Sequence, residues 1–329
     1  MPHRKLALHS LGWLRYQRRR ILRAGQISAL LFAPAVGLAL AGHAAAVFLF
    51  ALAANYSVLC MILARRLQPW SVPAIPALYL AGRLCVGQPL AMALLLSACL
   101  ALLAASARRG LHKGMQFWVF ALLLGNMTPT AAIAPWQEAG WMLLGASYGG
   151  ALARIGLADW FQALPGAAAA DARRYAWHLL PWGMLAWLAG NWMHGAHAWW
   201  LPLAVVAIPD PSPERMLWLA RERAIGTLAG TLLSGLLYWT LLWLSLAPVW
   251  HVLALCLLQM LLLITIRHSF RVFIAMLTAL VLSLLPPTQL AHGMLERVAD
   301  TLIAAMLLGA LAWFLRQRRP LPRAQDSSD

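Results

Sequence analysis

Charged residues are scarce in this chain, and acidic residues are the scarcer kind. Only 11% of the 329 residues are charged, whereas 62% are hydrophobic. A soluble domain needs about a quarter of its residues charged to cover its surface, so this composition excludes a soluble enzyme. The hydrophobic content also excludes a disordered chain. Lys and Arg together number 26 and Asp and Glu only 10, which gives a formal net charge of +16.

Cysteine and the common catalytic motifs are equally sparse. The chain has four cysteines, which form no CxxC pair and each lie in an apolar stretch: Cys60, Cys85, Cys99 and Cys256. We interpret them as packing residues, which predicts no metal site, no redox site and no secreted disulfide scaffold. The GxxxxGK[ST], GxSxG and HExxH motifs are missing. We therefore expect no enzymatic activity and no cofactor, so that any transport uses an ion gradient, a separate ATPase or simple diffusion.

Long apolar stretches dominate what is present. Crossing a bilayer takes roughly 20 residues of helix. Glycines, prolines and charge clusters divide the stretches, which predict membrane-spanning helices over residues 24–41, 44–63, 69–86, 89–106, 114–128, 138–155, 175–192, 198–209, 223–246, 248–266, 271–285 and 294–315. The eighth is short and contains two prolines, so we expect it to be bent or incomplete. The predicted fold class is an all-α polytopic membrane protein without a sizeable extramembrane domain.

The basic residues indicate how the predicted helices are oriented. All of them except Arg83 and Arg297 lie in the two tails or after even-numbered spans. This distribution follows the positive-inside rule and predicts that both termini lie in the cytoplasm. The net charge then reflects topology and contact with anionic membrane lipids, and not nucleic-acid binding. The first 23 residues lack a signal-peptide cleavage pattern, and we expect them to form a retained cytoplasmic tail.

A weak internal repeat relates the two halves of the chain. A shift of 154–160 residues places Arg66 on Arg223 and Glu138 on Glu296. Each half contains six predicted spans, and because six is even, the two halves have the same orientation in the membrane. We predict parallel six-helix repeats with a linker and two tails, divided as 1–23, 24–155, 156–172, 173–316 and 317–329. Duplicated six-helix units are typical of transporters, and some channels share the plan.

Charged residues near a span are candidates for function, because a charge at the centre of a spanning helix costs about 2.5–3.5 kcal/mol. We expect Arg223 at the start of a helix, where its guanidinium holds an anionic group or pairs with Asp210 or Glu214. The alternative is a cytoplasmic anchor.

A second group of charges lies in the last predicted span. Glu296, Arg297 and Asp300 are spaced to share one helix face. A carboxylate in a dry site has a raised pKa, which suits a proton carrier. The alternative for Asp300 is a salt-bridged or interfacial residue.

Small residues and histidines complete the candidates. Gly226, Gly230 and Ser234 recur every four residues, which allows another helix to approach closely, and Thr227 can hydrogen-bond across such a contact. His43 and His197 occupy related places in the two halves, either as protonatable groups at the outer mouth or as interfacial residues. No set of side chains predicts a metal site.

The segment from His197 to Gly235 resembles the core signature of the fusaric-acid-resistance (FUSC) family of bacterial inner-membrane proteins, also called the aromatic acid exporter family. The matching residues are the pair Trp199-Trp200, the break Pro211-Ser212, the stretch Arg223-x-x-Gly226-Thr227-x-x-Gly230 and, later, Arg297-x-x-Asp300-Thr301-x-x-Ala304. The first half lacks the R-x-x-G-T-x-x-G stretch: at the related position, residues 66–73 contain two prolines.

The resemblance implies efflux of small, often aromatic, carboxylic acids from a bacterial cell, driven by the proton gradient. It also implies a periplasmic adaptor and an outer-membrane channel as partner subunits. Two alternatives stay open: a passive anion channel, as in related plant members, and a non-transporting membrane subunit of an envelope-synthesis or export complex. Homo-oligomerisation through small-residue faces is a further open point.

Overall fold

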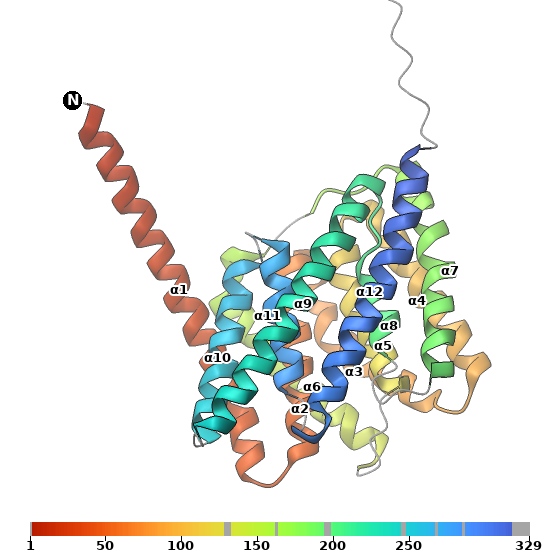
Figure 1. Ribbon diagram of the computed structural model, residues 1–329, viewed down its shortest axis with the longest axis horizontal. Coiled ribbons are helices and arrows are strands. Elements are labelled where there is room, and N and C mark those ends of the chain that lie inside the picture. Colours follow the sequence, from red (N-terminus) through yellow and green to blue (C-terminus); the bar gives the residue numbers. More distant parts are fainter. Residues whose placement is uncertain are drawn as a thin grey trace, which may run out of the picture.

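The structure is a computed structural model that describes residues 2–127, 133–161, 164–193, 199–244, 248–266, 269–284 and 287–317. Within these ranges the chain is helical and no residue lies in a strand (Figure 1). The α-helices are α1 (Pro2–Leu40), α2 (Ala44–Leu63), α3 (Gln68–Leu84), α4 (Pro89–Ser106), α5 (His112–Met127), α6 (Pro135–Gly156), α7 (Ala169–Met193), α8 (Trp200–Ala207), α9 (Pro213–Trp243), α10 (Pro248–Thr265), α11 (Phe270–Ser283) and α12 (Pro287–Gln317). Short 3₁₀ helices follow α2, α4 and α6: η1 (Arg65–Leu67), η2 (Ala107–Arg109) and η3 (Ala158–Trp160).

Several helix starts follow directly from local sequence. Ser212 is an extended N-cap whose Oγ accepts a hydrogen bond from the backbone N–H of Arg215 at 3.4 Å. Pro213 then occupies the first helical position of α9, where a missing N–H costs nothing. Ser269 caps α11 in the same way, accepting from the N–H of Val272 at 3.4 Å.

The first helix includes both the predicted basic tail, residues 1–23, and the start of the first predicted span at residue 24. α1 is continuous from Pro2 to Leu40. The junction is made of strong helix formers, and the single Gly25 costs only about 1 kcal/mol there, so nothing in the sequence breaks the helix. In Figure 1 the beginning of α1 projects away from the other helices.

The helices support a membrane protein but vary in how clearly each could span a bilayer. Within the described residues, four are long and apolar enough: Arg18–Leu40, Ala46–Leu63, Pro89–Arg109 and Glu214–Trp243. Two more, Trp250–Thr265 and Phe270–Ser283, are apolar but shorter. The expected short eighth element is α8, whose eight residues are all buried. The number of spans stays a prediction.

The same pairs of helices recur in both halves of the chain. α3 packs against α5 and α6 as α9 packs against α11 and α12, and α2 contacts α6 as α8 contacts α12. Contacts between the halves are related in the same way. α1 contacts α10, and α7, the counterpart of α1, contacts α4, the counterpart of α10. A shift of six helices relates these pairs to one another, whereas the contacts of α2 with α3 and α5 have no counterpart of similar size in the second half. The duplicated six-helix unit stays a prediction.

Small residues of α9 lie where it meets α11. A Cβ on Gly226 would lie 2.7 Å from the carbonyl oxygen of Arg271, and one on Gly230 would overlap that of Ala275. One turn further along, the hydroxyls of Ser234 and Ser283 are 3.2 Å apart and share a hydrogen bond between the two helices. The hydrogen bond expected from Thr227 is not found, because its buried Oγ1 has no partner among the described residues.

A buried ion pair lies inside the first half. Glu138 of α6 is 0% exposed, and its Oε2 accepts hydrogen bonds from Nε of Arg83 at 2.8 Å and from the Tyr79 hydroxyl at 3.0 Å. Both donors belong to α3. Arg83, one of the two exceptions to the arginine distribution, is therefore neutralised between α3 and α6.

Candidate functional site

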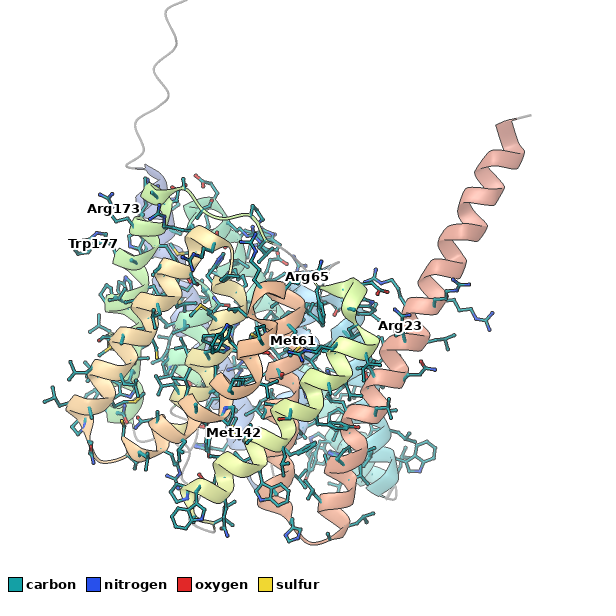
Figure 2. All side chains as sticks on the ribbon, turned by 180° about the vertical axis from the view of Figure 1, so that it is seen from behind. Arg23, Met61, Arg65, Met142, Arg173 and Trp177 are labelled. Atoms are coloured by element: carbon teal, nitrogen blue, oxygen red, sulfur yellow. The ribbon has the colours of Figure 1, made fainter. Side chains whose placement is uncertain are left out.

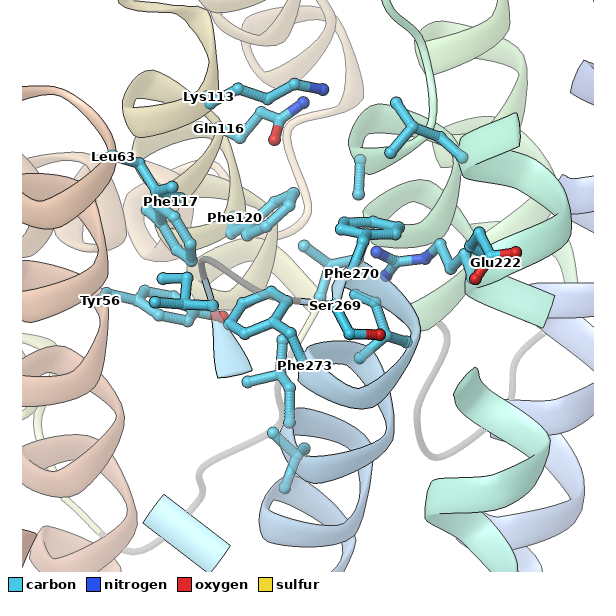
Figure 3. Close-up of a pocket in the computed structure, with 18 of the residues that line it drawn as sticks. Tyr56, Leu63, Lys113, Gln116, Phe117, Phe120, Glu222, Ser269, Phe270 and Phe273 are labelled. Carbon is cyan, nitrogen blue, oxygen red and sulfur yellow. The ribbon is translucent and has the colours of Figure 1, made fainter. Parts of the chain in front are cut away.

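A cavity of about 460 Å³ lies between the two halves. Its walls come from α2 and α5 on one side and from α8, α9, α11 and α12 on the other (Figure 3). Cavities of this size between helices are the usual places for small ligands. We therefore treat this cavity, called the seam cavity below, as the candidate functional site.

Aromatic rings form much of the cavity wall. Phe117 and Phe120 are three residues apart on α5, and Phe270 and Phe273 have the same spacing on α11, so each pair shares one helix face. Figure 3 shows the two pairs with Tyr56 of α2 beside them. The Tyr56 and Phe117 ring centroids are 5.4 Å apart, and those of Phe117 and Phe120 are 5.6 Å apart. These rings can contact the flat faces of an aromatic ligand.

Two buried arginines also line the cavity. Arg223 of α9 is 5% exposed and Arg297 of α12 is 6% exposed. Each lies ten residues from the start of its helix, about 15 Å along the axis at 1.5 Å per residue. α9 begins and α12 ends at the same end of the bundle, so both arginines lie well inside it (Figure 1).

Neither guanidinium forms an ion pair within the described residues, although Asp300, one turn along α12, interacts electrostatically with Arg297. Among the described residues, neither Arg223 nor Arg297 has a carboxylate oxygen within 4.0 Å. Nε of Arg223 and both Nε and Nη1 of Arg297 are buried without a hydrogen-bond partner. The guanidinium of Arg297 lies over the ring of Trp200, 5.4 Å from its centroid, which recovers part of the lost hydration. A guanidinium keeps its proton, so the cavity holds two positive charges that an anion would balance.

The acidic side chains around the cavity are already engaged. Glu222 receives two hydrogen bonds of 2.8 Å from Arg271 of α11, through Nε and Nη2. Asp210 lies 3.4 Å from Nζ of Lys113 and 3.4 Å from Nε of Arg215. These pairs join α9 to α11 and the connection between α8 and α9 to α5, so neither Glu222 nor Asp210 forms an ion pair with a buried arginine.

Lys113 marks the polar edge of the site at the start of α5, and the neighbouring His112 lies outside the cavity lining. Burial lowers the pKa of His112 to about 4, with Lys113 adding to the effect and Asp210 opposing it. His112 is therefore neutral at physiological pH. Burial also lowers the pKa of Lys113, while the Asp210 carboxylate opposes that shift.

The structure corrects the expected surroundings of Arg223. The residue is not at the start of a helix, because α9 begins at Pro213. It pairs with neither predicted acid: Asp210 is bound to Lys113 and Arg215, and Glu214 accepts a hydrogen bond of 2.8 Å from the Ser212 hydroxyl.

The remaining predicted residues are dispersed. Glu296 does not pair with Arg297 but with His292, at 2.8 Å. Asp300 is buried one turn beyond Arg297 and does not line the cavity. His43 is exposed beside Trp141, with ring centroids 6.1 Å apart, and does not line the seam cavity. His197 lies outside the described residues.

Sequence reasoning missed the first half's contribution to the site. Lys113, Gln116, Phe117 and Phe120 all come from α5, which carries no part of the family signature. A signal was available in the i, i+3 phenylalanine pairs of residues 117–120 and 270–273. The first half supplies aromatic wall and polar edge, whereas both buried arginines come from the second half.

Comparison with known protein families finds a match in the second half of the chain. Residues 185–312 match the model of a family described as fusaric acid resistance protein-like. The match runs from the later part of α7 through most of α12 and includes both buried arginines. It confirms the resemblance inferred from residues 197–235. Searches of curated proteins and of solved structures found no match.

Proposed function

We propose that this chain is an exporter of small organic anions, aromatic carboxylates among them, in the inner membrane of a bacterium. The observation that carries the proposal is the pair of buried arginines that line an aromatic cavity with N–H groups lacking a hydrogen-bond partner among the described residues. The family match over residues 185–312 adds to it, since it points to membrane transport of organic acids. The carboxylate would bind Arg223 and Arg297, and the ring would lie against the phenylalanines of α5 and α11.

The proposed topology has two parallel six-helix repeats, residues 24–155 and 173–316, with both termini in the cytoplasm. The recurring helix pairs support the repeat. Figure 2 supports a basic end of the molecule, since Arg65 and Arg173, from distant parts of the chain, lie in the upper half of the view. A cavity between two repeats can open to either side when one repeat rocks against the other.

Flux into proteoliposomes tests this function. We expect the purified full-length chain to carry radiolabelled benzoate faster than protein-free liposomes, and an imposed proton gradient to drive its accumulation. Benzoate flux that simply follows the benzoate gradient, whatever the proton gradient, would instead identify a passive anion channel. No flux of benzoate or its close analogues would contradict the transport proposal.

Proton coupling is assigned to Asp300, which is buried one turn from Arg297. Asp300→Asn removes the titratable group and keeps the side-chain size. We expect gradient-driven accumulation of benzoate to fall at least tenfold, while exchange of external for internal benzoate continues. The matched control is Asp171→Asn, which removes only a half-exposed pair with Arg174 at 3.6 Å and should change neither assay. Unchanged accumulation by Asp300→Asn would show that the proton is carried elsewhere.

A further inference from the structure

A second hollow, of about 350 Å³, lies at the ends of α2 and α4. It is formed by η1, η2 and the linker residues 164–166, and its charged lining consists of four arginines: Arg65, Arg66, Arg108 and Arg109. We call it the arginine hollow. It lies near the seam cavity, because Leu164 lines both.

The four arginines of the hollow form no ion pairs within the described part of the chain. All four are exposed, and among the described residues none has a carboxylate oxygen within 4.0 Å. Arg23, which is also at the surface, differs in being paired with Asp159 at 2.6 Å. Four guanidiniums around one hollow repel one another unless an anion lies between them.

Backbone contacts hold the hollow in shape. The N–H of Ala167 donates to the carbonyl of Ala107 at 2.9 Å. Gly110 has φ +69°, and a Cβ on it would overlap the carbonyl oxygen of Leu164, just as a Cβ on Gly166 would overlap that of Arg108. The linker between the halves is thus docked directly on η2, and the four side chains extend from a fixed frame.

We propose that the arginine hollow binds an anion carrying two or more phosphate groups. The planar guanidinium matches phosphate oxygens in bidentate geometry, and four such groups suit more than one phosphate. Basic pockets between helices at the face of a membrane bind phosphate headgroups on the same principle. The ligand would clamp the linker residues 164–167 against η2, beside the seam cavity. The site is independent of whether the seam cavity transports anions.

Native mass spectrometry of the full-length chain in a neutral detergent tests this site. We expect one cardiolipin, with two phosphates, to bind at least tenfold more tightly than phosphatidylglycerol, with one. Arg65→Gln together with Arg108→Gln should lower cardiolipin affinity at least tenfold. The control, Arg18→Gln together with Arg173→Gln, removes two exposed arginines outside the hollow and should change affinity less than twofold. Equal losses in the two double variants, or no loss in the first, would overturn the proposal.

Pyrophosphate distinguishes the source of the phosphate groups. If a soluble anion is the ligand, pyrophosphate should raise the melting temperature of the wild type and of the control variant but not of the hollow variant. If a lipid headgroup is the ligand, cardiolipin but not pyrophosphate should raise the melting temperatures of the wild type and of the control variant. Either result supports the hollow as a phosphate site, whereas a shift of equal size in all three proteins with both probes would overturn it. The melting temperatures without ligand show whether the variants fold.

Discussion

Arg297→Gln and Arg223→Gln are each expected to weaken benzoate binding about 100-fold. Removing one partner of a buried, hydrogen-bonded charge pair costs about 2–5 kcal/mol, and each 1.4 kcal/mol is a factor of ten. Each guanidinium has buried N–H groups without a partner, so the arginine that remains in a single variant keeps one positive charge in the cavity but does not replace the hydrogen bonds that the other would donate. Equilibrium binding of radiolabelled benzoate to purified protein in detergent measures the loss.

The matched control for this experiment is Arg221→Gln. Arg221 lies on the same helix, two residues before Arg223, but its side chain is exposed and does not line the cavity. The substitution removes the same charge, so we expect affinity to change less than twofold. Arg223→Lys keeps the charge without the planar fork and should lose an intermediate amount. If the two buried variants bind benzoate as tightly as the control does, the seam cavity is not the anion site.

The stability of the ligand-free protein separates binding from structure. A buried charge without a partner destabilises the fold, so Arg297→Gln should melt at or above the wild-type temperature when no ligand is present. Benzoate should then raise the melting temperature of the wild type but not of the variant. An arginine with a purely structural role would give the opposite result, a lower melting temperature without ligand.

The sequence predicts the helical membrane class and the signature region well, for physical reasons. Hydropathy and the arginine distribution depend on composition over long windows, which single contacts cannot reverse. The close approach of α9 to α11 at Gly226 and Gly230 is visible in the small-xxx-small spacing, because helical periodicity alone puts those residues on one face.

Side-chain partners could not be predicted in the same way. Arg83 and Arg297 look alike in sequence, because they are the two basic residues that depart from the predicted positive-inside distribution. Only packing separates them: Glu138 forms an ion pair with Arg83 between α6 and α3, whereas Arg297 lies over the ring of Trp200 and forms no ion pair within the described residues. Pairing between distant helices depends on their register and rotation, which periodicity does not specify. The same limit applies to Glu296: the spacing predicts a helix face shared with Arg297 and Asp300 but not its ion pair with His292.

The contrast between these two arginines predicts a large stability effect in the first half. Arg83→Met is expected to destabilise the protein by about 3–5 kcal/mol, because it leaves a carboxylate with 0% exposure beside Tyr79 and without its cation. Denaturant titration of the purified protein in detergent measures the change in unfolding free energy. The surface control is Arg23→Met, which breaks a shorter ion pair with Asp159, at 2.6 Å, but between side chains that are 48% and 73% exposed. It should cost less than about 1 kcal/mol.

The double variant Arg83→Met with Glu138→Met decides whether the loss comes from the stranded charge. Replacing both members of a buried pair by apolar groups is often neutral or stabilising by about 1–4 kcal/mol, so stability should return to the wild-type value or above it. Loss of the Tyr79 hydrogen bond would reduce that recovery by about 1 kcal/mol. If the double variant is as unstable as Arg83→Met alone, the pair acts through shape and not through charge. Arg83 would then differ from Arg297 in packing alone, and the lack of an ion pair at Arg297 among the described residues would no longer indicate an anion site.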